Sequence, residues 1–223
     1  MFGTTLSEQN DTAQDAADIP LAAADSLALI DAQQRRVGEQ IEPDARLLYG
    51  LWGVALLIGE GAFFFATWKD SPFDIPLAVA GVTLLVSLVS AMVLTSVHIA
   101  RRVAGVQGDS SRQGMFYGWT WMIGFLALAA VISGVTRTGV DEETIGLLWA
   151  AGSGLVIGLL YMAGGAMWLD RTQFALGAWF ALVSGAGAIA GTPWIYLVLS
   201  LAGGGGMLVV AGAIAVRTRQ HGR

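Results

Sequence analysis

The sequence predicts an all-α membrane protein with six transmembrane helices and with both termini in the cytoplasm. The first observation is composition, because 55% of the residues are hydrophobic and 13% are charged, against about 25% charged in soluble domains. The second is a set of six long apolar runs joined by short polar connections. The third is the distribution of lysine and arginine, which gather on alternate connections.

An α-helix needs roughly twenty apolar residues to cross about 30 Å of hydrocarbon. The runs are 47–68, 76–100, 115–135, 145–168, 174–191 and 193–216. Five of them meet the length comfortably, and the fifth is short and rich in glycine. Runs five and six have an alternative interpretation as a re-entrant hairpin around Gly191-Thr192-Pro193. Non-helical backbone is costly in lipid, which favours two full crossings.

The segment before the first run differs sharply from the rest of the chain. Nine of the seventeen acidic residues precede residue 45, and residues 1–19 predict a disordered acidic N-terminus. Residues 20–46 predict a cytoplasmic amphipathic helix and a linker. The apolar stripe of this helix consists of Leu27, Ile30, Val37 and Ile41. It has two interpretations: the stripe lies on the inner leaflet, or it docks a cytoplasmic protein partner or a second copy of the chain.

The distribution of positive charge sets the predicted orientation. With the N-terminus inside, ten of the twelve basic residues are cytoplasmic and two are external, which is a strong positive-inside bias. Residues 217–223 then form a basic cytoplasmic tail. Tyrosine and tryptophan gather near the run ends, where they anchor helices at the membrane–water interface. These aromatic residues are Tyr49, Trp52, Trp68, Tyr117, Trp119, Trp121, Trp168 and Trp194.

Several classes of function are disfavoured by what the sequence lacks. There is no cysteine, which excludes thiolate nucleophiles and cysteine-ligated metals. No basic face with interleaved aromatics indicates nucleic-acid binding. The motifs HExxH, GxSxG and the Walker loop are missing, so we expect no enzyme, no metal and no cofactor. His98 ends the second run without a second ligand nearby, and we interpret it as an interfacial residue rather than a metal ligand or titrating switch.

Glu60 is the strongest candidate for a functional residue. It is the one acidic residue well inside an apolar run, where a carboxyl costs several kcal/mol unless it is protonated or paired. Counting from the cytoplasmic side, four hydroxyls lie at a similar depth in other runs: Ser87, Ser153, Ser184 and Ser200. The functional interpretation is a proton or cation site. The structural interpretation, which we favour at this point, is a neutral carboxyl whose hydrogen bonds hold helices together.

Glycine is the second unusual feature. The sixth run contains Gly203, Gly204, Gly205 and Gly206 in its middle. Consecutive glycines weaken a helix, and a break at the membrane midplane is one way in which transporters build a substrate site. Small residues also allow helices to pack closely. Packing is the interpretation we favour, and this tetraglycine is where we expect a kink or local unwinding.

The stretch Asp31–Gly53, DAQQRRVGEQIEPDARLLYGLWG, resembles the start of the first span in a group of six-span membrane proteins from high-GC Gram-positive bacteria. Residue usage and loop lengths are similar over most of the chain. The group has no assigned activity, so the resemblance implies a bacterial plasma-membrane location and supplies no catalytic or binding residues.

Two hypotheses about function follow. The first is a non-enzymatic accessory or sensory membrane subunit whose cytoplasmic helix binds a partner. It predicts that Glu60→Gln is silent and that Leu27→Asp or Ile30→Asp abolishes association. The second is a small proton-coupled transporter or permease-like protein that uses Glu60, and it predicts the reverse. The sequence alone slightly favours the first, because one carboxyl is a narrow basis for transport.

Overall fold

A computed structural model describes residues 26–29, 32–33, 44–103 and 109–221. The chain divides into two units, Met1–Pro43 and Asp44–Arg223. In the first unit residues 26–29 and 32–33 are helical, and Leu27 and Leu29 are exposed. The predicted disordered segment 1–19 and the stripe residues Ile30, Val37 and Ile41 lie outside the described residues.

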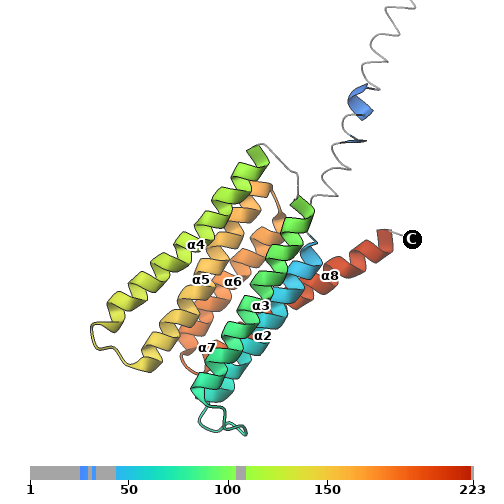
Figure 1. Cartoon of the computed structure of the whole chain (residues 1–223). Helices are drawn as coiled ribbons and strands as arrows, with labels where there is room; N and C mark the ends of the chain where they lie inside the picture. Colours follow the sequence, from blue (N-terminus) through green and yellow to red (C-terminus); the bar gives the residue numbers. More distant parts are fainter. Residues whose placement is uncertain (1–25, 30–31, 34–43, 104–108, 222–223) are drawn as a thin grey trace, which may run out of the picture. The chain divides into compact units, whose positions relative to one another are not determined.

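The second unit is built from helices alone over its described residues (Figure 1). Six of these are long and apolar enough to cross a membrane, which confirms the all-α class and the expected number of helices able to span. The last of the six is composed of three consecutive segments, α7, η1 and α8. The elements are α2 (Ala45–Thr67), α3 (Leu77–Val103), α4 (Asp109–Thr136), α5 (Glu142–Trp168), α6 (Arg171–Ala190), α7 (Trp194–Val198), η1 (Leu199–Gly204) and α8 (Gly205–His221).

The helices extend past several of the predicted boundaries because polar residues cap them. The carboxylates of Asp44, Asp141 and Asp170 accept hydrogen bonds from the first backbone N–H groups of α2, α5 and α6. The capping bonds of Asp141 also lower its pKa. The 20 residues of α6 and the 27 of Trp194–Gln220 are each enough for a crossing. The structure therefore describes the last two runs as two long apolar helices.

Alternation of the helices places their ends in two groups. We call the end at which α2, α4 and α6 begin the basic end and the opposite end the acidic end. The basic end carries Arg46, Arg101, Arg102, Arg112, Arg171, Arg217 and Arg219. The acidic end carries Asp70, Asp74, Asp141, Glu142 and Glu143 with Lys69 and Arg137. Figure 1 shows α8 leaving the bundle as it approaches the basic end.

Two helix pairs form the centre of the second unit. α5 packs along α6, and α2 packs along both α3 and the last helix. Glycine allows these close approaches: the backbone oxygen of Gly53 on α2 would lie 2.8 Å from a Cβ added to Gly204 on η1. A Cβ on Gly158 of α5 would likewise lie 2.8 Å from the Gly177 oxygen of α6. α3 and α4 are peripheral, and most of their side chains point away from the bundle.

Buried side chains form two apolar clusters at different depths. The cluster nearer the acidic end contains Phe64, Ala150, Val183, Ile195, Tyr196 and Leu199. The cluster nearer the basic end contains Tyr49, Leu56, Leu176, Phe180 and Met207. We call them the acidic-side cluster and the basic-side cluster. Along α2, the residue midway between Leu56 and Phe64 is Glu60.

Candidate functional site

Three polar side chains are buried in the described part of the chain: Glu60 on α2, Ser184 on α6 and Ser200 on η1. All three were candidates from the sequence. In each helix the residue lies where the basic-side and acidic-side clusters meet. The other two candidates are half-buried, with Ser87 on the peripheral α3 and Ser153 on α5. The polar level therefore has a buried centre made by α2, α6 and η1.

The serines do not donate to the Glu60 carboxyl. The Ser200 hydroxyl donates to the Leu57 backbone oxygen at 2.9 Å, and the Ser184 hydroxyl donates to the Ala151 backbone oxygen at 2.6 Å. Ser87 donates to the Thr83 oxygen of its own helix at 2.7 Å. The Ser200 and Ser184 hydroxyls thus link neighbouring helices, and the Ser87 hydroxyl bonds within α3.

Glu60 itself is 9% exposed. Across residues 44–103 and 109–221, no protein group forms a hydrogen bond or ion pair with its carboxyl. The glycines on either side make room for neighbouring helices, because Gly59 lies against Leu84 of α3 and Gly61 faces the Ser200 hydroxyl. Glu60 is thus packed inside the bundle without a protein partner for its carboxyl. Because no fully buried side-chain oxygen in the described chain lacks a partner, the carboxyl oxygens keep a small accessible surface.

The tetraglycine coincides with a change in helix winding rather than with a break. Residues Leu199–Gly204 form a π-helix, and α8 continues from Gly205. A π-helical turn inside an α-helix interrupts the regular i→i+4 hydrogen bonds of the backbone, and such turns are frequent at functional sites. The indole N–H of Trp179 donates to the Ala202 backbone oxygen at 2.8 Å. Trp179, which no sequence pattern singled out, stabilises this wide turn from α6.

Tyr196 is a second residue that sequence reasoning missed. It belongs to α7, is 6% exposed and stacks on Phe63 of α2 with ring centroids 5.4 Å apart. Its phenol is within electrostatic range of both Glu60 and Glu143. A tyrosine near the start of an apolar run normally indicates an interfacial anchor, so the sequence contained no signal that this one faces the interior.

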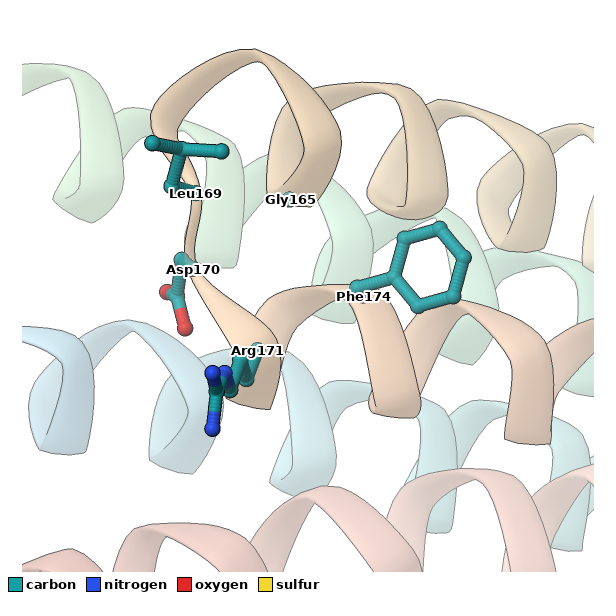
Figure 2. A pocket seen from close by; sticks show the side chains of 5 residues that line it. All are labelled: Gly165, Leu169, Asp170, Arg171 and Phe174. Carbon is teal, nitrogen blue, oxygen red and sulfur yellow. The ribbon is translucent and has the colours of Figure 1, made fainter.

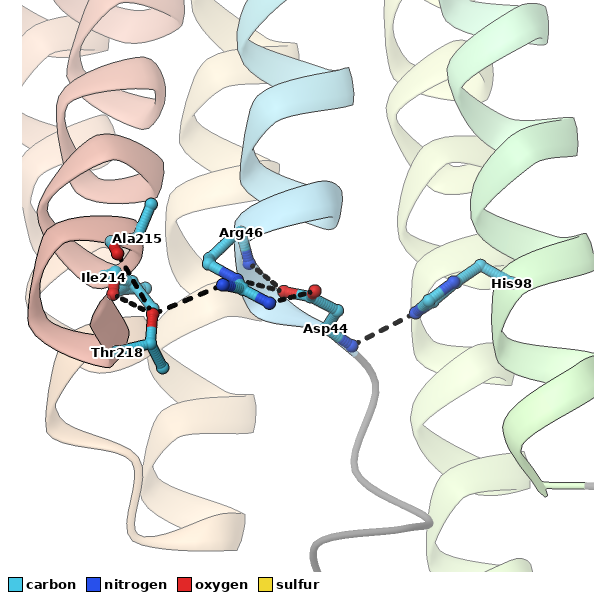
Figure 3. A network of polar contacts seen from close by, with 6 residues as sticks. All are labelled: Asp44, Arg46, His98, Ile214, Ala215 and Thr218. Carbon is cyan, nitrogen blue, oxygen red and sulfur yellow. Dashed lines mark hydrogen bonds and ion pairs between the residues drawn. The ribbon is translucent and has the colours of Figure 1, made fainter. Parts of the chain in front are cut away.

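At the basic end, a polar network joins three helices (Figure 3). The Arg46 guanidinium binds Asp44 with N–O distances of 2.9 and 2.8 Å and donates to Thr218 on α8 at 3.3 Å. The backbone N–H of Asp44 donates to Nε2 of His98 at the end of α3, at 3.1 Å. This bond requires the neutral imidazole, because only a deprotonated nitrogen accepts. The network fixes the start of α2 between α3 and α8.

The acidic member of this network stays charged at neutral pH. The hydrogen bond from the Arg46 side chain, opposed by partial burial, lowers the pKa of Asp44 from 3.8 to about 2. A depressed carboxyl pKa contributes stability that is complete above the unfolded value and is lost as the pH falls through the folded value. The contribution of Asp44 is therefore complete above pH 3.8 and disappears near pH 2.

One surface hollow of about 410 Å³ lies at the turn between α5 and α6 (Figure 2). It is lined by Gly165, Leu169, Asp170, Arg171 and Phe174. Asp170 is occupied as the cap of α6, where it accepts from the N–H groups of Thr172 and Gln173. The hollow is open, and we assign it to the shape of the turn rather than to a ligand.

Comparisons with known proteins add no relative. No family model matches the chain, and no curated protein or solved structure matches it.

Proposed function

We propose that this integral membrane protein is a small proton-coupled transporter or permease-like protein in which Glu60 is the proton-exchanging group. One observation carries the proposal: a carboxyl lies buried between two apolar clusters, and no described residue gives it a hydrogen bond or a countercharge. Intramembrane acidic residues are uncommon and by default mark ion or proton pathways.

Energetics favour this proposal over a structural role for Glu60. A polar residue that serves as glue between membrane helices gains about 0.6 kcal/mol from its hydrogen bond. A charged group at the centre of a helix costs about 2.5–3.5 kcal/mol on insertion scales, and a neutral polar group without a hydrogen bond costs about 1–3 kcal/mol. Because the serine hydroxyls donate elsewhere, Glu60 has no compensating bond, and proton exchange supplies a reason for its presence.

The orientation we propose places the basic end in the cytoplasm, with both termini there and with the plasma membrane as the location. Support comes from the two groups of helix ends, because arginine gathers at one end and acidic residues gather at the other. Cytoplasmic connections of membrane proteins are enriched in Lys and Arg. Under this orientation the acidic end faces outward.

A second candidate is the accessory or sensory subunit with a partner-binding cytoplasmic helix. It is favoured by the helical turn at residues 26–29, where Leu27 and Leu29 are 63% and 64% exposed. In this case a partner protein or a second copy covers the leucines. The two candidates differ in outcome, because only the second makes Leu27→Asp abolish association while Glu60→Gln is silent.

The site can be tested by infrared difference spectroscopy on the full chain reconstituted in lipid. We expect a carboxyl C=O band that changes reversibly with pH in the wild type and is missing in Glu60→Gln. Ser87→Ala is the matched control, because Ser87 bonds only within α3, and it should keep the band. A Glu60 band that is constant at every pH at which the protein stays folded would contradict the proposal.

A further inference from the structure

The access route to Glu60 can be deduced from the groups on either side of it. We propose that Tyr196 relays protons between Glu143 at the acidic end and Glu60, so that the described conformation is open to protons from the acidic end and closed toward the basic end. This inference deepens the proposed function and rests on it.

The ring of Tyr196 lies beside the helix turn that contains Glu60. It stacks on Phe63 at a centroid distance of 5.4 Å with 29° between the planes. Phe63 follows Glu60 by three residues on α2, and residues at this spacing are neighbours on a helix surface. The stacking therefore fixes the phenol on the acidic side of the carboxyl.

The hydroxyl of Tyr196 reaches the neighbouring helix α5. A Cβ added to Gly146 would lie 2.6 Å from this oxygen, so the hydroxyl occupies space that any larger residue would take. Gly146 follows Glu143 by three residues on α5, which puts the hydroxyl about one helical turn inward from Glu143. Glycine at position 146 thus makes room for a polar group between the surface and the interior.

Glu143 provides the aqueous end of the route. Its side chain is exposed and accepts a hydrogen bond from the Thr192 hydroxyl, close to the start of α7. The helices packed against α7 are α2, α5 and α6. These helices carry the titratable groups Glu142 and Glu143 at the acidic end and Glu60 inside the bundle. Of these, Glu60 and Glu143 are the two that act electrostatically on the Tyr196 phenol.

The proton transfer balances without any net change at tyrosine. The O–H bond of Tyr196 breaks as its proton moves to the Glu60 carboxylate, and the phenol oxygen takes a proton from the Glu143 carboxylic acid. The transfer requires water molecules to bridge the intervals between the groups. The result is a protonated Glu60, an ionised Glu143 that takes its next proton from solvent, and an unchanged tyrosine.

The opposite direction is sealed by apolar side chains. On the basic side of Glu60 lie Leu56, Phe180 and Met207, the last two only 1% exposed. The next polar group along α2 is the Trp52 indole, eight residues before Glu60, whose N–H donates to the Thr95 hydroxyl at 3.1 Å. Beyond it lie the phenols of Tyr49 and Tyr161, whose rings are 6.3 Å apart. The position of Tyr49 on α2 is eleven residues before Glu60, about 16 Å along a helix. Protons therefore reach Glu60 from the acidic end.

The test measures hydrogen–deuterium exchange of the Glu60 carboxyl by time-resolved infrared spectroscopy of the full chain in lipid, with Glu60→Gln assigning the band. We expect Tyr196→Phe to slow the exchange by about tenfold or more, equivalent to about 1.4 kcal/mol in the barrier. The phenyl ring keeps the stacking on Phe63. Gly146→Ala should also slow the exchange, because the new methyl displaces the hydroxyl while tyrosine remains.

The matched control is Tyr161→Phe, which removes a phenol from the basic-side half of the bundle and should leave the exchange rate unchanged. Wild-type exchange in both Tyr196→Phe and Gly146→Ala would overturn the relay, as would equal slowing in Tyr161→Phe. The exchange rate of the Glu60 carboxyl can be measured whether or not the protein transports protons. Slow exchange in Tyr196→Phe, combined with a wild-type protein that moves no protons across a membrane, would support the relay while rejecting the transport function.

Discussion

Gly204→Ala is expected to destabilise the protein by about 1–3 kcal/mol, the usual cost of overpacking a close contact. A Cβ at this position would lie 2.7 Å from the Leu57 nitrogen and 2.8 Å from the Gly53 oxygen on α2. Both are backbone atoms, which no side-chain rotation can move aside. The π-helix and α2 must separate, and the Ser200–Leu57 hydrogen bond of 2.9 Å is then weakened as well. Equilibrium unfolding in bicelles measures the change.

The neighbouring Gly205 supplies the control. A Cβ there would meet nothing within 4 Å, and alanine has a helix propensity higher than that of glycine by about 1 kcal/mol. Gly205→Ala should therefore be neutral or stabilising. Equal losses of stability in the two variants would show that the helical winding itself excludes alanine from the tetraglycine. That result would contradict the role of the tetraglycine in close packing against α2.

Glu60→Leu is expected to stabilise the protein by about 1–3 kcal/mol, because it removes a polar group whose burial costs this much without a partner. Leucine is similar to glutamate in size and can join the Leu56 and Phe64 surfaces on either side. The measurement is the free energy of unfolding in lipid or detergent, with Glu60→Gln beside it. A carboxyl that costs stability is the sign of a residue kept for function.

The opposite sign would support a structural role. If Glu60 joined helices through hydrogen bonds, Glu60→Leu would remove those bonds and leave their partners unpaired. The protein would then be destabilised by about 1 kcal/mol. Ser200→Ala serves as the reference for a true interhelical bond, because its hydroxyl donates from η1 to α2. Glu60→Leu and Ser200→Ala should therefore change the stability in opposite directions.

The six helices were predictable because the width of the hydrocarbon layer fixes a minimum length of apolar sequence. What the apolar runs could not locate was the helix ends, since Asp44, Asp141 and Asp170 cap the helices outside the apolar residues. These capping residues lie in the polar connections between the apolar runs. Orientation in the membrane stays a prediction.

The level of the candidate site was also predictable, since depth follows from counting residues along a helix at 1.5 Å each. Glu60, Ser184 and Ser200 are the buried polar residues found at that level in the described chain. Their hydrogen-bond partners were not predictable, because these depend on how each helix is rotated about its axis. Spans that are apolar on every side have no pattern that fixes this rotation, and glycine contacts such as Gly53–Gly204 set it instead.

Tyr196 and Trp179 were missed for a related reason. Aromatic residues occur in spans as interfacial anchors, so their presence alone indicates no site. The π-helical segment brings the Ala202 oxygen to Trp179, and the placement of α7 brings the Tyr196 phenol to Gly146. Both contacts depend on the packing of the last helix against α5 and α6, which is a property of the folded bundle.

The central claim is that Glu60 exchanges protons in a transport cycle that also runs without a second substrate, and proton flux in proteoliposomes tests it most directly. Vesicles containing the full chain and a pH-sensitive dye would be given a pH step, with valinomycin and potassium to clamp the voltage. The account predicts a flux in the wild type that falls to the level of empty vesicles in Glu60→Gln and persists in Ser87→Ala. A flux unchanged in Glu60→Gln, or a wild-type flux no greater than that of empty vesicles, would contradict it.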